Sequence, residues 1–209
     1  KDTDYAIAGT NYVDGTLTLT ITGGLGTTSD TITITGVSDT LYEGAEDITL
    51  ALDSFSNALA GTTTSQTLSV TDDDSAPTIT FDAATSTATE GDGTVTVGVT
   101  LGAASGLDAT IPYTVSGTAT GSSTDHDLTD ASLTIAAGLT TGSISFALTD
   151  DAQAEGDETV IVTMTTGSLT NASAGATTEH TLTIADDETP PTVAFTASSQ
   201  SAAESVGSI

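Results

Sequence analysis

The chain has almost no positive charge: Lys1 is its only lysine, arginine is absent, and 29 residues are aspartate or glutamate. Binding to nucleic acid depends on Lys and Arg, which release counterions from phosphates, so nucleic acid is excluded as a partner. Anionic membrane surfaces are excluded for the same reason. The net charge of −28 keeps the chain soluble but opposes a compact state. This repulsion predicts bound cations, and divalent metal ions are the first candidate.

Cysteine is also absent, so no disulfide stabilises the fold. No apolar run approaches the roughly 18 residues of a membrane span, so we expect no direct membrane insertion by this segment. Threonine, glycine and aspartate are abundant, with 48 threonines among the 209 residues. This composition is typical of large secreted repeat proteins, and we expect an extracellular or cell-surface location.

One acidic pattern occurs twice along the chain. Glu43-Gly44-Ala45-Glu46-Asp47, followed by Asp72-Asp73-Asp74, recurs as Glu155-Gly156-Asp157-Glu158, followed by Asp186-Asp187-Glu188. The offsets are 112 residues (43 to 155) and 114 residues (72 to 186). Pro77–Phe81 and Glu90 recur as Pro191–Phe195 and Glu204 with the second offset. A fixed period of this size predicts a tandem array of one domain type.

The array predicts three parts in this chain. We expect a repeat at 1–74 that lacks its first strands, a complete repeat at 75–188, and the first strand of a third repeat at 189–209. The links are very short, with Ser75-Ala76 before Pro77 and Thr189-Pro190 before Pro191. Such proline-bounded links favour a semi-rigid rod, and the chain is expected to be a window of a longer array.

Short runs alternate apolar and polar residues with period two, which indicates strands with one buried face. In the complete repeat, Val95, Val97, Val99 and Leu101 share a face, and similar runs contain Ile144–Leu148, Val160–Met164 and Leu182–Ile184. With Thr78–Phe81, Ala109–Ser116 and Ser132–Ala136 they give about seven strands. The prediction is all-β: tandem Ig-like antiparallel β-sandwiches. Pro112 should mark a sheet edge or a bulge.

The acids of the complete repeat fall where several strands end. Glu90 follows the first strand, Asp125 precedes the fourth, one acidic turn joins the fifth and sixth, and Asp186–Glu188 end the last. In an antiparallel sandwich these points reach one pole. Calcium takes six to eight hard oxygen ligands, whereas magnesium needs a tighter octahedron and zinc prefers His and Cys. The sequence therefore predicts Ca2+ at this pole.

The same segments resemble the Calx-beta domain, the calcium-binding sandwich of sodium–calcium exchangers, integrin β4 and many bacterial surface proteins. The resemblance rests on Thr89–Gly93, Gly117-Thr118-Ala119 leading to Asp125, the turn Asp150–Glu158, and Asp186–Glu188. It suggests a large bacterial surface protein. The calcium ligands that it implies in the complete repeat are Glu90, Asp125, Asp150, Asp151, Glu155, Glu158, Asp186, Asp187 and Glu188. The family has Asp-Tyr where this repeat has Asp125-His126-Asp127, so Asp127 is an alternative to Asp125.

The first repeat retains part of this ligand set. The resemblance implies Asp4, Asp39, Glu43, Glu46, Asp72, Asp73 and Asp74 as its ligands. Ser38 stands where the first Asp of the acidic turn belongs, and the counterpart of Glu90 lies outside the chain. We expect fewer or weaker calcium ions there. Acid runs in turns are usually solvated loops, but recurrence in register in two copies favours calcium binding.

Catalytic groups are scarce, so we expect no enzyme. The two histidines have no Cys, Lys or Arg nearby, and His180 is expected at the surface or a sheet edge. The predicted function is a calcium-stabilised structural segment of an extracellular adhesin, surface filament or matrix fibre. Its partners would be neighbouring repeats of the same chain and other copies in a fibre. The alternatives are a regulatory calcium-sensing pair of a transporter or receptor and an accessory carbohydrate-binding module.

Overall fold

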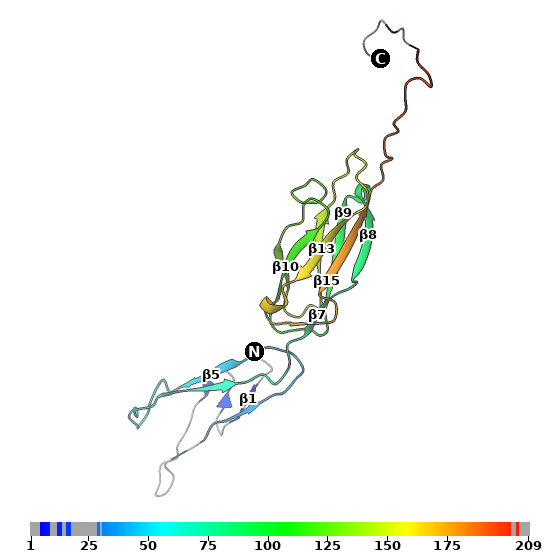
Figure 1. Cartoon of the computed structure of the whole chain (residues 1–209). Helices are drawn as coiled ribbons and strands as arrows, with labels where there is room; N and C mark the ends of the chain where they lie inside the picture. Colours follow the sequence, from blue (N-terminus) through cyan, green and yellow to red (C-terminus); the bar gives the residue numbers. More distant parts are fainter. Residues whose placement is uncertain are drawn as a thin grey trace.

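The structure is a computed structural model in which residues 5–8, 12–13, 16–17, 29, 31–201 and 204 are described (Figure 1). The first repeat contains β1 (Tyr5–Ala8), β2 (Tyr12–Val13), β3 (Thr16–Leu17), β4 (Thr33–Gly36), β5 (Glu46–Ala51) and β6 (Ser65–Val70). The complete repeat contains β7 (Thr78–Phe81), β8 (Thr85–Thr89), β9 (Thr94–Leu101), β10 (Ala109–Gly117), β11 (Ala131–Ile135), β12 (Thr141–Ala147), β13 (Glu158–Met164), β14 (Ser173–Ala174) and β15 (Glu179–Ala185). Two 3-10 helices, η1 (Glu90–Asp92) and η2 (Thr166–Ser168), complete it. The all-β prediction is confirmed.

The complete repeat is a sandwich of two sheets. One sheet has the strand order β11-β10-β13-β15-β8 and the other has the order β12-β9-β7-β14. Neighbouring strands are antiparallel except at two edges, where β8 pairs with β15 and β14 pairs with β7 in parallel. The predicted Ig-like sandwich is therefore confirmed, and the structure adds two parallel edge strands that the sequence pattern did not indicate.

The opening segment of the complete repeat changes sheets. β7 pairs with β9, and after a bend the chain enters the other sheet as β8. At the bend, Asp82 N–H donates to Gly98 O at 3.0 Å, and Thr181 N–H donates to Ala84 O at 2.9 Å. The chain is thus tied to both sheets, and β8 delivers Glu90 to the pole where β15 ends.

Alternating apolar side chains fill the space between the sheets. Val97, Val99 and Leu101 are each at most 4 % exposed, as the period-two pattern predicts. They belong to one cluster with the inward residues of the facing sheet, which include Val160, Val162, Met164, Leu182 and Ile184. Burying a side chain of this size contributes about 1.5–3 kcal/mol, so apolar packing stabilises this core.

Pro112 does not lie in an edge strand, which corrects the prediction. It lies within β10, which has β11 on one side and β13 on the other. The ladder between β10 and β13 begins only at Tyr113, so Pro112 lies just beyond its end. Just past the end of β13, Thr165 N–H donates to Pro112 O at 2.8 Å, so the Pro112 carbonyl is paired there although proline has no N–H to donate in return.

Among its described residues, the first repeat has the same strand register, but its hydrophobic side chains are less buried. Glu46 opposes Val70 in the β5–β6 hairpin, as Glu158 opposes Ile184 between β13 and β15. Leu68 is nevertheless 41 % exposed, whereas its counterpart Leu182 is 2 % exposed. The difference arises because β5 and β6 form a two-stranded sheet with no further partner strand among the described residues.

Residues 190–201 contain no strand, although we predict that this region opens a third repeat. Val193 and Phe195 are each 98 % exposed, whereas their counterparts Ile79 and Phe81 are buried in β7. β7 is held by its pairing with β9, and the described part of the tail has no such partner. No helix among the described residues is long and apolar enough to cross a membrane.

Candidate metal centre

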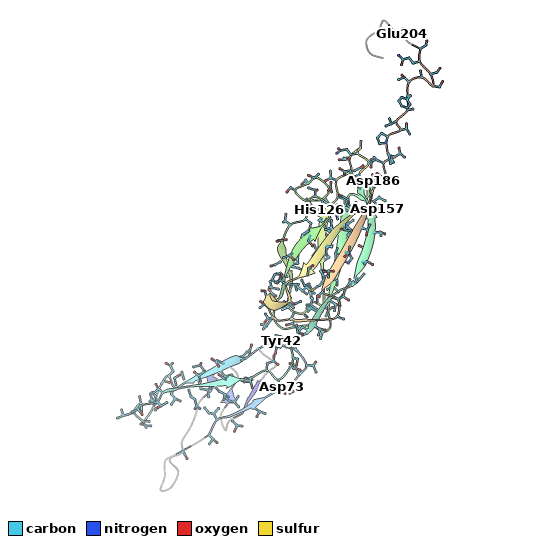
Figure 2. All side chains as sticks on the ribbon, viewed as in Figure 1. Tyr42, Asp73, His126, Asp157, Asp186 and Glu204 are labelled. Carbon is cyan, nitrogen blue, oxygen red and sulfur yellow. The ribbon has the colours of Figure 1, made fainter. Side chains whose placement is uncertain are left out.

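The nine acids predicted in the complete repeat meet at the end of the sandwich where β15 finishes. We call this group the acidic pole: Glu90, Asp125, Asp150, Asp151, Glu155, Glu158, Asp186, Asp187 and Glu188. They come from η1, the β10–β11 loop, the β12–β13 loop with the start of β13, and the segment after β15. Figure 2 labels Asp186 at this end, away from the end that faces Tyr42 of the first repeat.

Asp186 holds the acidic turn in place. Its Oδ2 accepts hydrogen bonds from Glu155 N–H at 3.0 Å and Gly156 N–H at 2.8 Å. Its Oδ1 accepts from Glu188 N–H at 3.2 Å. The Gly156 bond is the largest of the effects that lower the pKa of Asp186, since hydrogen bonds to the ionised form favour it. This carboxylate therefore stays ionised and fixes two acidic segments relative to each other.

Glu90 carries its carboxyl into the interior of the pole. It is 7 % exposed, and burial is the main reason why its pKa is raised. The negative charges of Asp186, Asp151, Glu155 and Asp187 raise it further. One carboxylate oxygen from each of Glu90, Asp187 and Glu188 lies within 4.8 Å of the others. Buried carboxylates normally have a positive partner, and this chain has no arginine and only Lys1.

Two further carboxyls are so crowded that their pKa values rise to about 7. For Glu158 the causes are burial, a side-chain hydrogen bond with Asp125, and then the charges of Asp125, Glu155 and Glu90. For Glu188 the causes are burial, a side-chain hydrogen bond with Asp186, and then the neighbouring charges. At neutral pH these carboxyls hold protons in part, because the pole gathers more negative charge than water alone stabilises.

Asp150 and Asp151 flank this cluster. A Cβ placed at Gly91 would lie 3.6 Å from Asp187 Oδ2 and 3.9 Å from Asp150 Oδ2, so the backbone of η1 runs close beside both carboxylates. Asp151 accepts hydrogen bonds from Gln153 N–H at 2.7 Å and Gln153 Nε2–H at 2.9 Å. Gln153 therefore positions Asp151, a role that its sequence position did not suggest.

Asp127, the alternative to Asp125, is engaged elsewhere. Its Oδ1 accepts a hydrogen bond from Ala147 N–H of β12 at 2.8 Å. Asp125 Oδ2 instead accepts from Thr120 N–H at 2.5 Å, and Asp125 is the residue bonded to Glu158. The structure thus places Asp125 in the pole and uses Asp127 to hold the loop against β12.

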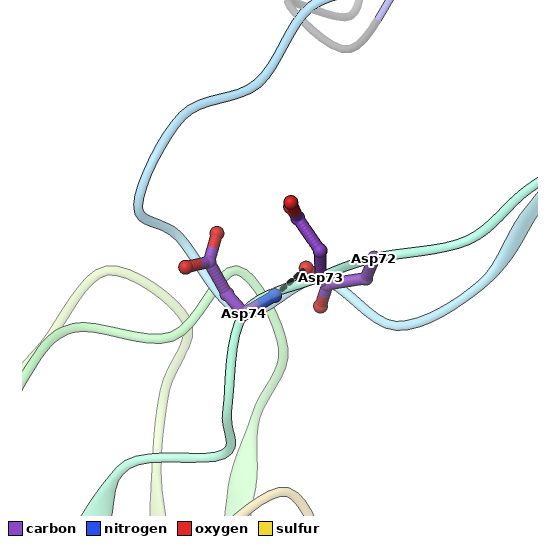
Figure 3. Close-up of side chains that lie close together, drawn as sticks. All are labelled: Asp72, Asp73 and Asp74. Atoms are coloured by element: carbon purple, nitrogen blue, oxygen red, sulfur yellow. Dashed lines mark hydrogen bonds between the residues drawn. The ribbon is translucent and has the colours of Figure 1, made fainter.

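The first repeat reproduces the same scaffold. Asp72, the counterpart of Asp186, accepts hydrogen bonds at Oδ2 from Glu43 N–H and Gly44 N–H, both at 2.8 Å. Its Oδ1 accepts from Asp74 N–H at 3.0 Å, the bond drawn in Figure 3. Asp72, Asp73 and Asp74 also bring one carboxylate oxygen each within 4.8 Å of the others.

A pocket of about 370 Å3 gathers the acids of the first repeat. It is lined by Asp39, Glu43, Glu46 and Asp72–Asp74, together with Ser38 and apolar residues such as Val70. These are all of the candidates predicted there except Asp4, which lies outside the described residues. The pKa of Asp74 is raised by burial and by the charges of Asp72, Asp73 and Asp39, so crowding of negative charge recurs in this copy.

Both histidines are buried within the complete repeat. His180 is 3 % exposed, which corrects the expectation of a surface or edge residue. Its Nδ1 lies 2.7 Å from Ala83 O and its Nε2 lies 2.9 Å from Ser86 Oγ. It is buried because β8, absent from the sequence prediction, covers β15 at the sheet edge. His126 is also 3 % exposed and packs edge-on against Phe146.

The chain is similar to known proteins in sequence and in structure. The family model for the Calx-beta domain matches residues 2–74 and 72–188. Similar solved structures include the crystal structure of CBD12 from CALX1.2, which is 21 % identical with a TM-score of 0.48, covering 53 % of this chain and 44 % of that chain. The apo-form Calx CBD1 domain is 21 % identical with a TM-score of 0.49, covering 55 % of this chain and 100 % of that one. The chain thus spans less than half of the CBD12 structure.

The Calx CBD2 domain is 17 % identical with a TM-score of 0.44, covering 52 % of this chain and 86 % of that one. No curated protein sequence matches the chain. The two regions matched by the family model overlap at residues 72–74 and together include most of the sequence. The Asp72–Asp74 cluster lies in this overlap, and the cluster of Glu90, Asp187 and Glu188 lies in the second region. The chain therefore belongs to the Calx-beta family and carries two regions of this domain type in tandem.

Proposed function

We propose that this chain binds calcium at the acidic pole of the complete repeat and in the acidic pocket of the first repeat. The observation that carries the proposal is Glu90, a buried carboxylate surrounded by other carboxylates in a chain with a single lysine. Two unit charges about 4 Å apart repel by roughly 4 kcal/mol at an effective dielectric of 20. A bound divalent cation offsets this repulsion, and the sequence has no arginine and only one lysine, Lys1, to do so.

The donor set fits calcium better than other common metals. Every candidate ligand is a carboxylate oxygen, and Ca2+ takes six to eight oxygen ligands in a flexible arrangement. Glu90, Asp187 and Glu188 would hold the ion most directly, since their oxygens already lie within 4.8 Å of one another. Asp72–Asp74 would serve in the same way in the first repeat. Both histidines are buried within the core, and cysteine is absent, which disfavours zinc.

The bound ion would act on structure rather than on a chemical reaction. Its role would be to neutralise the pole and to fix the acidic loops at the end of the sandwich. Two settings use such a module. A regulatory calcium-sensing pair in a larger protein is the setting that the family match supports more directly. Gly106 N–H of the complete repeat donates a hydrogen bond to Tyr42 O of the first repeat at 2.8 Å, and this contact between repeats supports the other setting, a segment of an extracellular array in an adhesin or fibre.

Calcium affinity distinguishes these two settings. Among EF-hand proteins, sensors bind calcium with dissociation constants of about 10⁻⁷–10⁻⁵ M, whereas extracellular modules bind at about 10⁻⁴–10⁻³ M. Isothermal titration of the whole chain with CaCl2 gives this value directly. A dissociation constant in the first range supports the regulatory role, and one in the second range supports the structural role.

The binding site itself is tested with a matched pair of variants. Glu90→Gln removes the buried carboxylate and should reduce calcium affinity of the complete repeat by about a hundredfold, or about 2.7 kcal/mol. Glu179→Gln is the control, because Glu179 is an exposed residue at the opposite end of β15 and loses the same charge. Equal affinities for Glu90→Gln and the unmodified chain would refute the assignment, as would the absence of calcium binding by the unmodified chain.

A further inference from the structure

One turn of the complete repeat contacts the first repeat directly. Ser105-Gly106-Leu107 lies between β9 and β10. Figure 2 labels Tyr42 near the end of the sandwich opposite to Asp186. Gly106 N–H donates a hydrogen bond to the carbonyl oxygen of Tyr42 at 2.8 Å. Ser105 Oγ–H donates to the same oxygen at 3.2 Å. Tyr42 and Ser105 also form an isolated parallel β-bridge.

The turn is held rigidly by its own repeat. Ser105 is 1 % exposed, and its Oγ accepts a hydrogen bond from Leu107 N–H at 3.1 Å. Its carbonyl oxygen accepts from Gly138 N–H of a neighbouring loop at 2.8 Å. Because the complete repeat fixes both donors, the turn presents a preformed site for one main-chain carbonyl.

The segment that docks there is equally fixed by the first repeat. Asp72 bonds the N–H groups of Glu43 and Gly44, the two residues that follow Tyr42. Packing at the contact is close: a Cβ at Gly106 would lie 2.6 Å from Glu43 Cγ, and a Cβ at Gly44 would lie 3.5 Å from Leu107 Cδ1. Two rigid elements therefore meet over hydrogen bonds and van der Waals contacts, in addition to the short covalent link.

We propose that the turn Ser105–Leu107 is the docking surface for the acidic loop of the preceding repeat, and that it sets the direction between the two repeats without bound metal. The contacts are made by the chain itself, so the proposal is independent of calcium binding. The short link at Ser75-Ala76 keeps the two repeats close together but does not by itself fix the rotation of one repeat relative to the other. The docking contact is proposed to fix this rotation. Relative motion of domains is the default unless an interface restricts it.

A larger side chain at Gly106, called the wedge below because it would push the two repeats apart, tests the proposal. Gly106 does not have a positive φ, so a side chain is compatible with its backbone, and the three atoms nearest to an added Cβ all belong to Glu43 of the first repeat. Gly106→Val therefore acts on the contact rather than on the core of the complete repeat. Gly167→Val is the matched control, because an added Cβ there meets nothing within 4 Å and φ is not positive.

Distances between spin labels measure the orientation. The chain has no cysteine, so Gln66→Cys in β6 and Ser143→Cys in β12 provide one exposed label site in each repeat. All measurements are made in chelator, which separates this proposal from calcium binding. We expect a narrow distance distribution for the otherwise unmodified chain and for Gly167→Val, and about a twofold broadening or a shifted maximum for Gly106→Val.

A second substitution on the other side of the contact checks the cause. Glu43→Ala removes the atoms that the wedge meets, so combining it with Gly106→Val should restore the narrow distribution. If Gly106→Val lowers the melting temperature of the complete repeat, Gly106→Ala supplies a smaller wedge with the same expected direction. The proposal is overturned if the chain without a wedge gives a broad distribution in chelator, or if a folded wedge variant gives an unchanged narrow one.

Discussion

Glu90→Gln should change the stability of the complete repeat in opposite directions with and without calcium. Without metal, Glu90 is a buried negative charge whose pKa is raised first by burial and then by the charges of Asp186, Asp151, Glu155 and Asp187. Replacing it with a neutral amide of the same shape removes repulsion and should stabilise the fold. With calcium, the same change removes a ligand and should destabilise it.

The magnitudes follow from the spacing of the carboxylates. Oxygens of Glu90, Asp187 and Glu188 lie within 4.8 Å of one another. At that distance two unit charges repel by about 3.5 kcal/mol at a dielectric of 20 and by about 0.9 kcal/mol in bulk water. Because solvent reaches part of the pole, we expect Glu90→Gln to raise the free energy of unfolding without metal by about 1–2 kcal/mol. This raises the melting temperature of a domain of this size by about 4–8 °C. A hundredfold loss of calcium affinity removes about 2.7 kcal/mol at saturating metal, which exceeds the gain.

Scanning calorimetry at pH 8, well above the ordinary pKa of glutamate, provides the assay. The whole chain and the Glu90→Gln variant are heated in chelator and in excess calcium, with Glu179→Gln as the control of equal charge. The variant should melt above the unmodified chain in chelator and below it in calcium. The reasoning is refuted if Glu90→Gln melts lower under both conditions, since the buried carboxylate would then be satisfied without metal.

Three further predictions follow from the same geometry. Calcium at about 100 times its dissociation constant should stabilise each occupied repeat by about 2.7 kcal/mol and raise its melting temperature by several degrees, with a much smaller effect of magnesium; identical melting curves with and without chelator would contradict calcium binding. Glu155→Ala should cost more calcium affinity than Glu43→Ala, because the complete repeat has Asp150 where the first has Ser38; titration calorimetry of both variants decides, and a larger loss for Glu43→Ala would reverse the ranking. In chelator, the free energy of unfolding should fall as pH rises from 5 to 8. The pKa values of Glu158 and Glu188 are raised from 4.5 to about 7, so in this window the folded state holds protons that the unfolded state releases. A melting temperature that is flat or rising between these pH values would show that the two carboxyls are not crowded in the folded state.

Local sequence patterns determined the strands and the repeats. The alternation of Val97, Val99 and Leu101 with threonines predicted β9 and its buried face, because side chains of a strand point to opposite sides with period two. The recurrence of Glu43 as Glu155 and of Asp72 as Asp186 predicted a tandem array and two acidic clusters. These features are encoded in neighbouring residues or in fixed offsets, so no knowledge of partner strands is required.

Tertiary structure decided which of these residues are buried and what each acid does. β8 was not predicted, because its short run of alternating small residues becomes a strand only beside β15, about 95 positions later in the chain. That pairing covers His180 and carries Glu90 into the interior. Asp72 and Asp186 bind main-chain N–H groups of a loop about 30 residues earlier, which composition does not reveal. The contact between Tyr42 and Ser105 depends on a main-chain carbonyl, an atom that every residue possesses, and so the sequence carries no signal for it.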